Sequence, residues 1–510
     1  MKLTPWLANL IWHALLLLLV GGCNSGQVVL PTATGVAGPT STSLPTSQSP
    51  TSDGGSNPEV AIEATAEYKP LPTPRPHGLP ETRLNAGDYQ PHDMFGYAVD
   101  VDGALLAVGA PGKNGAGLEA GGEYFFEPGT NVISLRSLMA GQEVGGVYIF
   151  ERSGQEWNQM AGLVPDSLRK NDRLGMSVAV EAGTVAAGAP YATTQAGGFA
   201  AGAVYVFARQ GDGWVEQARL TAGDGGPFDL FGSALALDGD TLVVGAQGVD
   251  DPALGRNAGA AYVYHREKGA WVEQARLSPP DGGADDFFGQ SVAIRGEVIA
   301  VGAYGHDDPE SGPNSGAVYL FQGQDGAWYF NSKLASAGPS PKAQFGFSLA
   351  FAGELLQPTW LAVGANQYAS QPVDIRYAVP PGRVELFRWQ DQAWRPATRL
   401  DIEQDEEMQT GLVGATLAMD LLGGERLALA AGSQFGTRVH LFQGSDRTWG
   451  PATIIQPQEY QLTFGKAVAI SDRFLAVGSP WSVERLPDGQ SVTEVPQSGA
   501  VFIYDLSGLK

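Results

Sequence analysis

The chain has 510 residues, and 54 acidic against 31 basic residues leave a formal net charge of −23. A surface of this sign repels nucleic acid and anionic lipid head groups, so neither is expected as a partner, and cationic or neutral partners such as glycans or proteins remain. The sequence holds one cysteine, which excludes a disulfide within the chain, so stability must come from burial of a core.

The first 23 residues indicate export. Lys2 is the only charged residue before an apolar segment from Leu7 to Val20, and Gly21-Gly22-Cys23 follows it. This pattern resembles a bacterial lipoprotein signal, in which small residues precede a cysteine that becomes the acylated amino terminus. The alternatives are an ordinary cleaved signal peptide or a membrane helix, for which the apolar run is short. Residues 1–22 are therefore predicted to be a lipoprotein signal peptide, with Cys23 as the lipid attachment site.

Residues 23–79 are predicted to be a disordered linker that carries the lipid anchor. The segment is rich in Ser, Thr and Pro and has few large apolar residues. Such a composition buries too little surface to offset the entropy of ordering. A flexible chain of about 55 residues spans roughly 40 Å, which would hold the following domain away from a membrane surface.

A repeat of 57 residues dominates the rest of the chain. It is clearest from Phe231, where SALAL and TLVVGA flank the turn DGD and are followed by AAYVY and WVEQARL, before Phe288-Gly289 begins the next copy. Each of the four runs is β-branched, aromatic or alternating, and each is bounded by Gly, Asp, Asn or Pro. Four strands repeated at a fixed period predict the blade of a β-propeller.

Seven copies of the repeat are present between residues 80 and 510. Each copy carries a glycine after its first aromatic or aliphatic residue and a second glycine 13 or 18 residues later. The first glycines of the seven pairs are Gly96, Gly175, Gly232, Gly289, Gly346, Gly414 and Gly465. The chain ends on a third strand, whereas Glu81-Thr82-Arg83-Leu84 matches the end of a fourth strand. The prediction is an all-β, seven-bladed propeller of four-stranded antiparallel blades, whose last blade is closed by an amino-terminal strand.

These repeats resemble the FG-GAP repeat, which builds the amino-terminal propeller of integrin α chains and occurs in many bacterial extracellular proteins. Phe95-Gly96 with Gly109-Ala110-Pro111 carries the motif almost literally, and Phe464-Gly465 with Gly478-Ser479-Pro480 is close to it. The resemblance covers about residues 80–510, and the sixth repeat departs most from the pattern. It implies a propeller that binds or adheres rather than one that catalyses.

Strand direction predicts that the loops joining strands two and three share a face with the connections between blades. We call this the loop face. The distance from the second glycine to the third strand is 17 residues in the standard repeat, 39 in the first, 21 in the fifth and 24 in the seventh. Loops on a rigid scaffold are common recognition sites. The first insertion holds Tyr124, Phe125, Phe126 and Arg136, residue types favoured at binding hot spots. The alternative is that these aromatic side chains pack within their own loop.

Metal binding receives little support from the sequence. The calcium loop that the integrin resemblance implies between strands one and two is replaced by short turns, so no metal site and no cofactor are predicted. The weaker candidates for calcium are Asp250, Asp251, Asp307 and Asp308, at equivalent positions of the third and fourth repeats. Because paired Asp before Pro is also a turn signal, a purely structural role is the alternative.

Four aspartates that precede the first glycine of a repeat, Asp93, Asp172, Asp229 and Asp286, recur once per blade. This repetition predicts a structural role in accepting backbone N–H bonds, since a catalytic residue is expected once. One tryptophan in each of the first six repeats, in or near strand four, is likewise expected to be a packing residue. The six histidines show no metal-ligand spacing.

The sequence therefore predicts a bacterial, membrane-anchored lipoprotein outside the cytoplasm that is not an enzyme. The function expected is a binding or adhesion module for an extracellular protein or glycan, with the ligand on the loop face that carries the insertions of blades one, five and seven. One alternative is an extracytoplasmic enzyme acting on polysaccharide through converging carboxylates. A structural protein that assembles in the envelope is another.

Overall fold

The computed structural model describes residues 78–114, 143–366, 382–401, 413–482 and 498–509, apart from short gaps at 89, 91, 339–340, 355–356, 423–425, 434–435, 446–447, 459–460 and 462. The predicted signal peptide, Cys23 and most of the linker therefore lie outside the described residues. The same is true of the insertion loops at 115–142, 367–381 and 483–497. In the described part, no helix is both long and apolar enough to cross a membrane.

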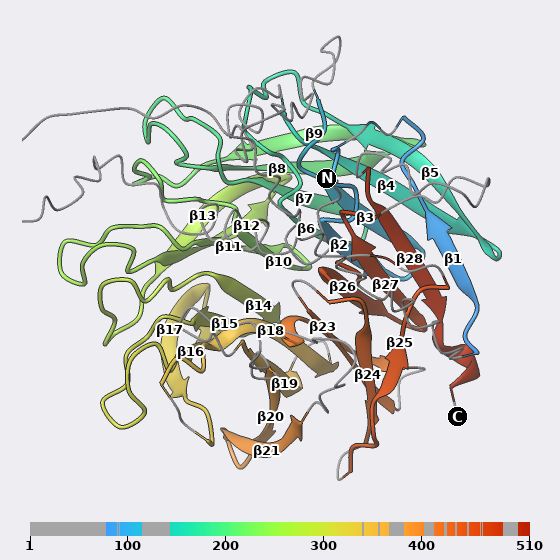
Figure 1. Cartoon of the computed structure of the whole chain (residues 1–510). Coiled ribbons are helices and arrows are strands. Elements are labelled where there is room, and N and C mark those ends of the chain that lie inside the picture. Colours follow the sequence, from blue (N-terminus) through green and yellow to red (C-terminus); the bar gives the residue numbers. More distant parts are fainter. Residues whose placement is uncertain are drawn as a thin grey trace, which may run out of the picture. The chain divides into compact units, whose positions relative to one another are not determined.

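The described residues form seven four-stranded antiparallel sheets, which confirms the predicted propeller (Figure 1). Blades one to three are β2 (Ala98–Asp102), β3 (Leu105–Ala110), β4 (Gly146–Ser153) and β5 (Glu156–Leu163); β6 (Ser177–Glu181), β7 (Thr184–Ala189), β8 (Ala203–Gln210) and β9 (Gly213–Leu220); and β10 (Ala234–Asp238), β11 (Thr241–Ala246), β12 (Ala260–Glu267) and β13 (Ala270–Leu277). Blades four and five are β14 (Ser291–Arg295), β15 (Val298–Ala303), β16 (Ala317–Gln324) and β17 (Ala327–Leu334), and β18 (Phe345–Glu354), β19 (Gln357–Ala365), β20 (Arg383–Gln390) and β21 (Ala393–Asp401).

Blades six and seven complete the ring. Blade six is β22 (Val413–Leu422), β23 (Arg426–Ser433), β24 (Val439–Gly444) and β25 (Thr453–Ile455). Blade seven is β26 (Ala467–Ser471), β27 (Phe474–Ser479), β28 (Ala500–Asp505) and β1 (Glu81–Leu84), followed by the short 3-10 helix η1 (Leu506–Gly508). In Figure 1 the blue β1 runs beside the red β28, and residues 81–84 pair with 501–504 in antiparallel register. The strand expected from the amino-terminal side therefore closes the last blade.

Burial explains the residue types of each strand. Strand two of a blade lies between two hydrogen-bonded neighbours and two packed blades, so small and β-branched residues fill it; all six residues of β3, β7, β15 and β27 are buried. Strand four is the outer edge, and in β5 and β13 exposed residues outnumber buried ones. The core is thus a series of apolar layers between adjacent blades.

The two glycines that mark each repeat meet at the interface between blades. A Cβ atom on Gly245 of β11 would lie 2.0 Å from the carbonyl oxygen of Gly289, which follows the first phenylalanine of the next blade. Gly289 has a φ of +91°, which favours glycine. Phe288 before it is fully buried and packs edge-to-face on Tyr319, with ring centroids 5.6 Å apart. Close backbone approach therefore explains why both positions hold glycine.

Candidate functional site

The loop face is described most completely in blades two, three and four, where the loops have standard length. The predicted ligand-binding residues Tyr124, Phe125, Phe126 and Arg136 lie outside the described residues, so their role stays a prediction. The described part of the loop face consists of the loops joining β7 to β8, β11 to β12 and β15 to β16, together with the connections that follow β9, β13 and β17.

The paired aspartates of blades three and four organise their own loops. Asp250 and Asp307 accept the backbone N–H groups of Asn257 and Asn314 at 2.8 and 2.7 Å. Asp251 accepts the N–H of Ala253 at 2.9 Å, and Asp308 accepts those of Glu310 and Ser311 at 3.0 and 2.9 Å. The Ala253 N–H holds the pKa of Asp251 below its usual range, and the Ser311 hydroxyl and N–H do the same for Asp308. The turn role that the sequence left open as the alternative is therefore present.

Metal coordination at these aspartates stays a prediction that only binding measurements test. Within the described residues, no group of three or more His, Cys, Asp or Glu side chains is arranged to hold a metal ion. Asp250 and Asp307 each use one carboxylate oxygen for a backbone N–H, which leaves them one oxygen with no such bond. Calcium needs six to eight oxygen ligands, so these loops would have to recruit further groups.

The aspartates that precede the first glycine have the predicted structural role. Asp93, Asp172, Asp229 and Asp286 are buried, and each accepts a backbone N–H from the residue three positions earlier, at 2.6–2.9 Å. Burial raises the pKa of Asp93 to about 6 and raises those of Asp172 and Asp229 as well. Because the same environment recurs in four blades, these aspartates stabilise the fold and are not specific to one site.

A second set of polar contacts links blades one, three and four to the connection before each of them. A tyrosine of strand three donates its hydroxyl to an aspartate of the preceding connection, and a basic side chain binds the same aspartate. The sets are Tyr148, Asp88 and Lys113; Tyr262, Asp224 and Arg276; and Tyr319, Asp281 and Lys333. The hydroxyl-to-carboxylate distances are 2.7, 2.7 and 2.8 Å. These sets were not predicted from the sequence, although Asp224 and Asp281 are separated by 57 residues, the length of one repeat.

Blade five is linked to the preceding connection at the same place, but by different residues. Glu385 takes the position of the tyrosine, since it pairs with Val363 as Tyr319 pairs with Val301. Its buried carboxylate accepts the Ser336 hydroxyl at 2.5 Å and the Ala337 N–H at 2.9 Å. The carboxylate thus comes from the strand rather than from the connection, which preserves the link between the blades.

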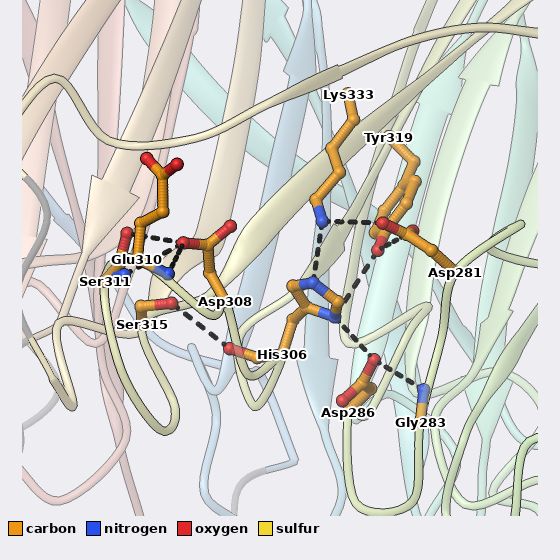
Figure 2. Close-up of polar contacts among 10 residues, drawn as sticks. All are labelled: Asp281, Gly283, Asp286, His306, Asp308, Glu310, Ser311, Ser315, Tyr319 and Lys333. Carbon is orange, nitrogen blue, oxygen red and sulfur yellow. Dashed lines mark hydrogen bonds and ion pairs between the residues drawn. The ribbon is translucent and has the colours of Figure 1, made fainter.

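Blade four has the most extended polar cluster, centred on His306 (Figure 2). The imidazole is 5% exposed; its Nδ1 lies 2.8 Å from Asp286 Oδ2 and its Nε2 lies 2.7 Å from Lys333 Nζ. Because an ammonium group only donates, Nε2 must accept, and Nδ1 carries the proton donated to Asp286. Lys333 also binds Asp281 at 2.9 Å. The imidazole therefore lies between an aspartate and a lysine.

This cluster connects the buried Asp286 with the set of Tyr319, Asp281 and Lys333, and it does not present a reactive group. An Asp–His pair is a familiar base, but a general base needs its second nitrogen free to reach a substrate proton. Here Lys333 occupies Nε2, and the nearby Ser311 and Ser315 hydroxyls donate to Asp308 and to the His306 carbonyl. The arrangement is suited to holding the loop in place.

An exposed aromatic pair distinguishes the contact between blades two and three. Phe199 and Phe228 are 57% and 55% exposed, and their rings meet edge-to-face with centroids 5.4 Å apart. The equivalent contact between blades three and four is an ion pair, with Arg256 Nη2 3.0 Å from Asp285 Oδ2. The backbone is the same in both places, because Phe228 N–H donates to Phe199 and Asp285 N–H donates to Arg256. Large exposed apolar side chains on rigid loops favour a partner.

Comparison with known families agrees with this architecture. The family model described as the FG-GAP repeat matches residues 80–126, 157–207, 214–264 and 271–321. The last three matched segments each run from an outer strand to the third strand of the next blade. A search of curated proteins finds no match to the chain.

Proposed function

Because the chain is an FG-GAP repeat protein whose seven blades form a propeller resembling that of integrin α chains, we propose that it is a non-enzymatic binding or adhesion module. Its partner is an extracellular protein or glycan. The ligand binds the loop face, where the insertions of blades one, five and seven join the loops of blades two to four. No cofactor takes part.

The observation that carries this proposal is the exposed pair Phe199 and Phe228. Folded chains usually bury or isolate such rings, whereas here two lie together at a position where the next blade has an ion pair. Backbone bonds across the connection hold both loops, so little ordering entropy would be lost on binding. The polar groups of the same face are already bonded to one another, which supports binding over catalysis.

We further propose that Cys23 carries the lipid anchor and that residues 24–79 tether the propeller outside the cytoplasm. The support is the sequence pattern of residues 1–23. Labelling cells with a fatty acid analogue tests the anchor: the natural protein is expected to take up label and the Cys23→Ala variant is not. Equal labelling of both would refute the anchor and leave the ligand proposal standing.

A binding screen tests the ligand proposal. Residues 78–510 would be applied to a glycan array and to extracellular envelope proteins, with and without a chelator. A variant with Phe199→Arg and Phe228→Asp installs the ion pair of the neighbouring interface and should fold. We expect it to lose most binding, since truncating a hot-spot residue costs about 2 kcal/mol or more.

The matched control carries Arg256→Ala and Asp285→Ala on the same face and should bind normally. A second variant that lacks residues 115–142 measures how much the first insertion contributes to binding. The chelator measures any contribution of calcium. Full binding by the charged double variant would remove the aromatic pair from the site. Failure of the natural protein to bind any glycan or envelope protein would overturn the proposed function as a binding or adhesion module.

A further inference from the structure

The outer strands of blades one to five each contain a β-bulge at the same place. In every case one residue of strand four has no partner in the ladder with strand three. The bulge residues are Met160, Gln217, Gln274, Asn331 and Ala397. A repeated bulge re-aims one side chain per blade, so its identity decides what the next blade contacts.

Two of these bulge residues hold the tryptophan of the following blade. Trp271 Nε1 donates to Gln217 Oε1 at 2.8 Å, and Trp328 Nε1 donates to Gln274 Oε1 at 2.9 Å. The glutamine thus satisfies the indole and occupies the space between the outer strands. This bond joins blade two to blade three and blade three to blade four.

The contact between blades five and six lacks this bond. Trp449 is the equivalent tryptophan, since it pairs with Gly444 as Trp328 pairs with Gly323. The bulge residue beside it is Ala397, whose methyl side chain cannot accept a hydrogen bond. The indole Nε1 of Trp449 is accordingly buried without a hydrogen-bond partner. A buried donor without a partner is destabilising, so an acceptor supplied by a ligand would be favoured at this place.

A pocket of about 260 Å³ opens at this contact. Trp360 and Trp449 form its aromatic walls, with ring centroids 6.0 Å apart at 78°. Arg388 lies 5.5 Å above the Trp360 ring, and the exposed Arg395 lines the mouth. Gln390, Pro396, Ala397 and Thr398 complete the lining.

The lining is cationic in a strongly acidic protein. Its eight residues include two arginines and no aspartate or glutamate, although the whole chain carries a net charge of −23. Guanidinium groups bind carboxylates with two parallel hydrogen bonds, and indole rings pack against flat apolar faces. The volume is below the range typical for drug-sized ligands, so one ring-sized unit fits.

We propose that this pocket binds one uronic acid unit of an acidic polysaccharide. The carboxylate pairs with Arg395, the apolar face of the sugar packs on Trp449, and hydroxyl groups meet Gln390 and Thr398. A sugar oxygen that enters at the position taken by the glutamine in blades two and three accepts the Trp449 N–H. Arg388 and Gln390 lie near the β20–β21 turn, on the side opposite the loop face, so this site is separate from the one proposed above.

The full-length protein would be titrated with tetragalacturonate and, in parallel, with its methyl ester, using calorimetry and tryptophan fluorescence. We expect the acid to bind and the ester to bind at least about tenfold more weakly, because the ester removes the charge. Ala397→Gln installs the glutamine of blades two and three, should leave the melting temperature unchanged or higher, and should weaken binding at least about tenfold. Arg395→Gln should do the same through loss of the cation.

Two controls separate this site from general effects. Asn331→Gln introduces the same residue at the equivalent bulge of blade four, and Lys268→Gln removes one positive charge at a distant turn; both should bind normally. No binding of tetragalacturonate, equal binding of acid and ester, or undiminished binding by Ala397→Gln would each overturn the proposal. The loop-face variant with Phe199→Arg and Phe228→Asp should bind tetragalacturonate fully, so failure of either proposal is distinguishable from failure of the other.

Discussion

The tyrosine position of strand three shows how the residue at one place in the blade differs with its surroundings. Tyrosine in blades one to four gives way to Glu385 in blade five and to His440 in blade six. Each change is matched by its neighbours: Glu385 meets a hydroxyl and a backbone N–H, whereas His440 lies opposite the apolar Ile454. His440 is 3% exposed, and burial together with the charge of Arg438 lowers its pKa to about 4.

This depressed pKa predicts a pH dependence of stability. Between pH 6.5 and 4 the unfolded chain binds a proton at His440 that the folded protein excludes, so its contribution to stability is lost as the pH falls through that window. The loss is up to about 3 kcal/mol. His440→Phe, which copies Phe502 of blade seven, should remove it.

Urea unfolding of both proteins at pH 4.5 and 7.5 gives the measurement. The buried carboxylates, including Asp100 with a pKa raised to about 7 by burial, act in the opposite direction but cancel in the comparison. The stability difference between variant and natural protein should shift in favour of His440→Phe at the lower pH. An unchanged difference would show that His440 is not held neutral.

At the level of the strand and its turn, the short hairpins between strands one and two are joined in series. The last residue of strand one in one blade accepts a backbone N–H from the hairpin of the next: Asp102 from Ala182, Glu181 from Gly239, and Ser471 from Gly103 at 2.8, 2.6 and 2.9 Å. Asp238 bonds to Gly296 in the same way. These contacts occupy the place where the integrin resemblance implied a calcium loop, and they link blades through side chains.

Glu181→Ala should lower the free energy of unfolding by about 0.5–1.5 kcal/mol, because the bond to Gly239 is lost but water can replace it at the exposed turn. Chemical denaturation measures the change. Glu216→Ala, which removes an exposed carboxylate from the outer strand β9, should be nearly neutral and serves as the control. An equal effect of the two changes would attribute the loss to net charge and not to the link.

The whole propeller depends on a strand from the other end of the chain. β1 pairs with β28, Glu81 Oε2 accepts the Tyr504 hydroxyl at 2.9 Å, and Leu84 is buried in the layer between blades seven and one. Without β1 the edge of β28 would offer unpaired backbone groups to other molecules. Closure also brings Asp88 to Tyr148 and Lys113 of blade one.

A fragment beginning at residue 89 should therefore associate or aggregate and melt at a lower temperature than one beginning at residue 78. Size-exclusion chromatography with light scattering and a thermal melt measure both effects. A synthetic peptide of residues 78–88 should restore the monomer in part. If the two fragments behaved alike, β1 would be a passive addition to the ring.

The repeat made the blade number and the closing strand predictable, because each blade must place glycine at the same two close backbone contacts and apolar residues on the same strands. Phe288, Gly289 and Gly245 are constrained locally, so their pattern is visible in the chain. The structural role of Asp229 was predictable for the same reason. These features need only one blade and its neighbour.

The polar sets and the pocket depended on which blades face each other. Nothing near Ala397 in the sequence says that Trp449 lies beside it or that its N–H has no acceptor. Likewise, only packing brings His306 between Asp286 and Lys333. Repetition specifies what every blade shares, because each copy must satisfy the same contacts. The distinctive chemistry arises where one copy departs from the rest, and its consequence is set by the partner that the closed ring places against it.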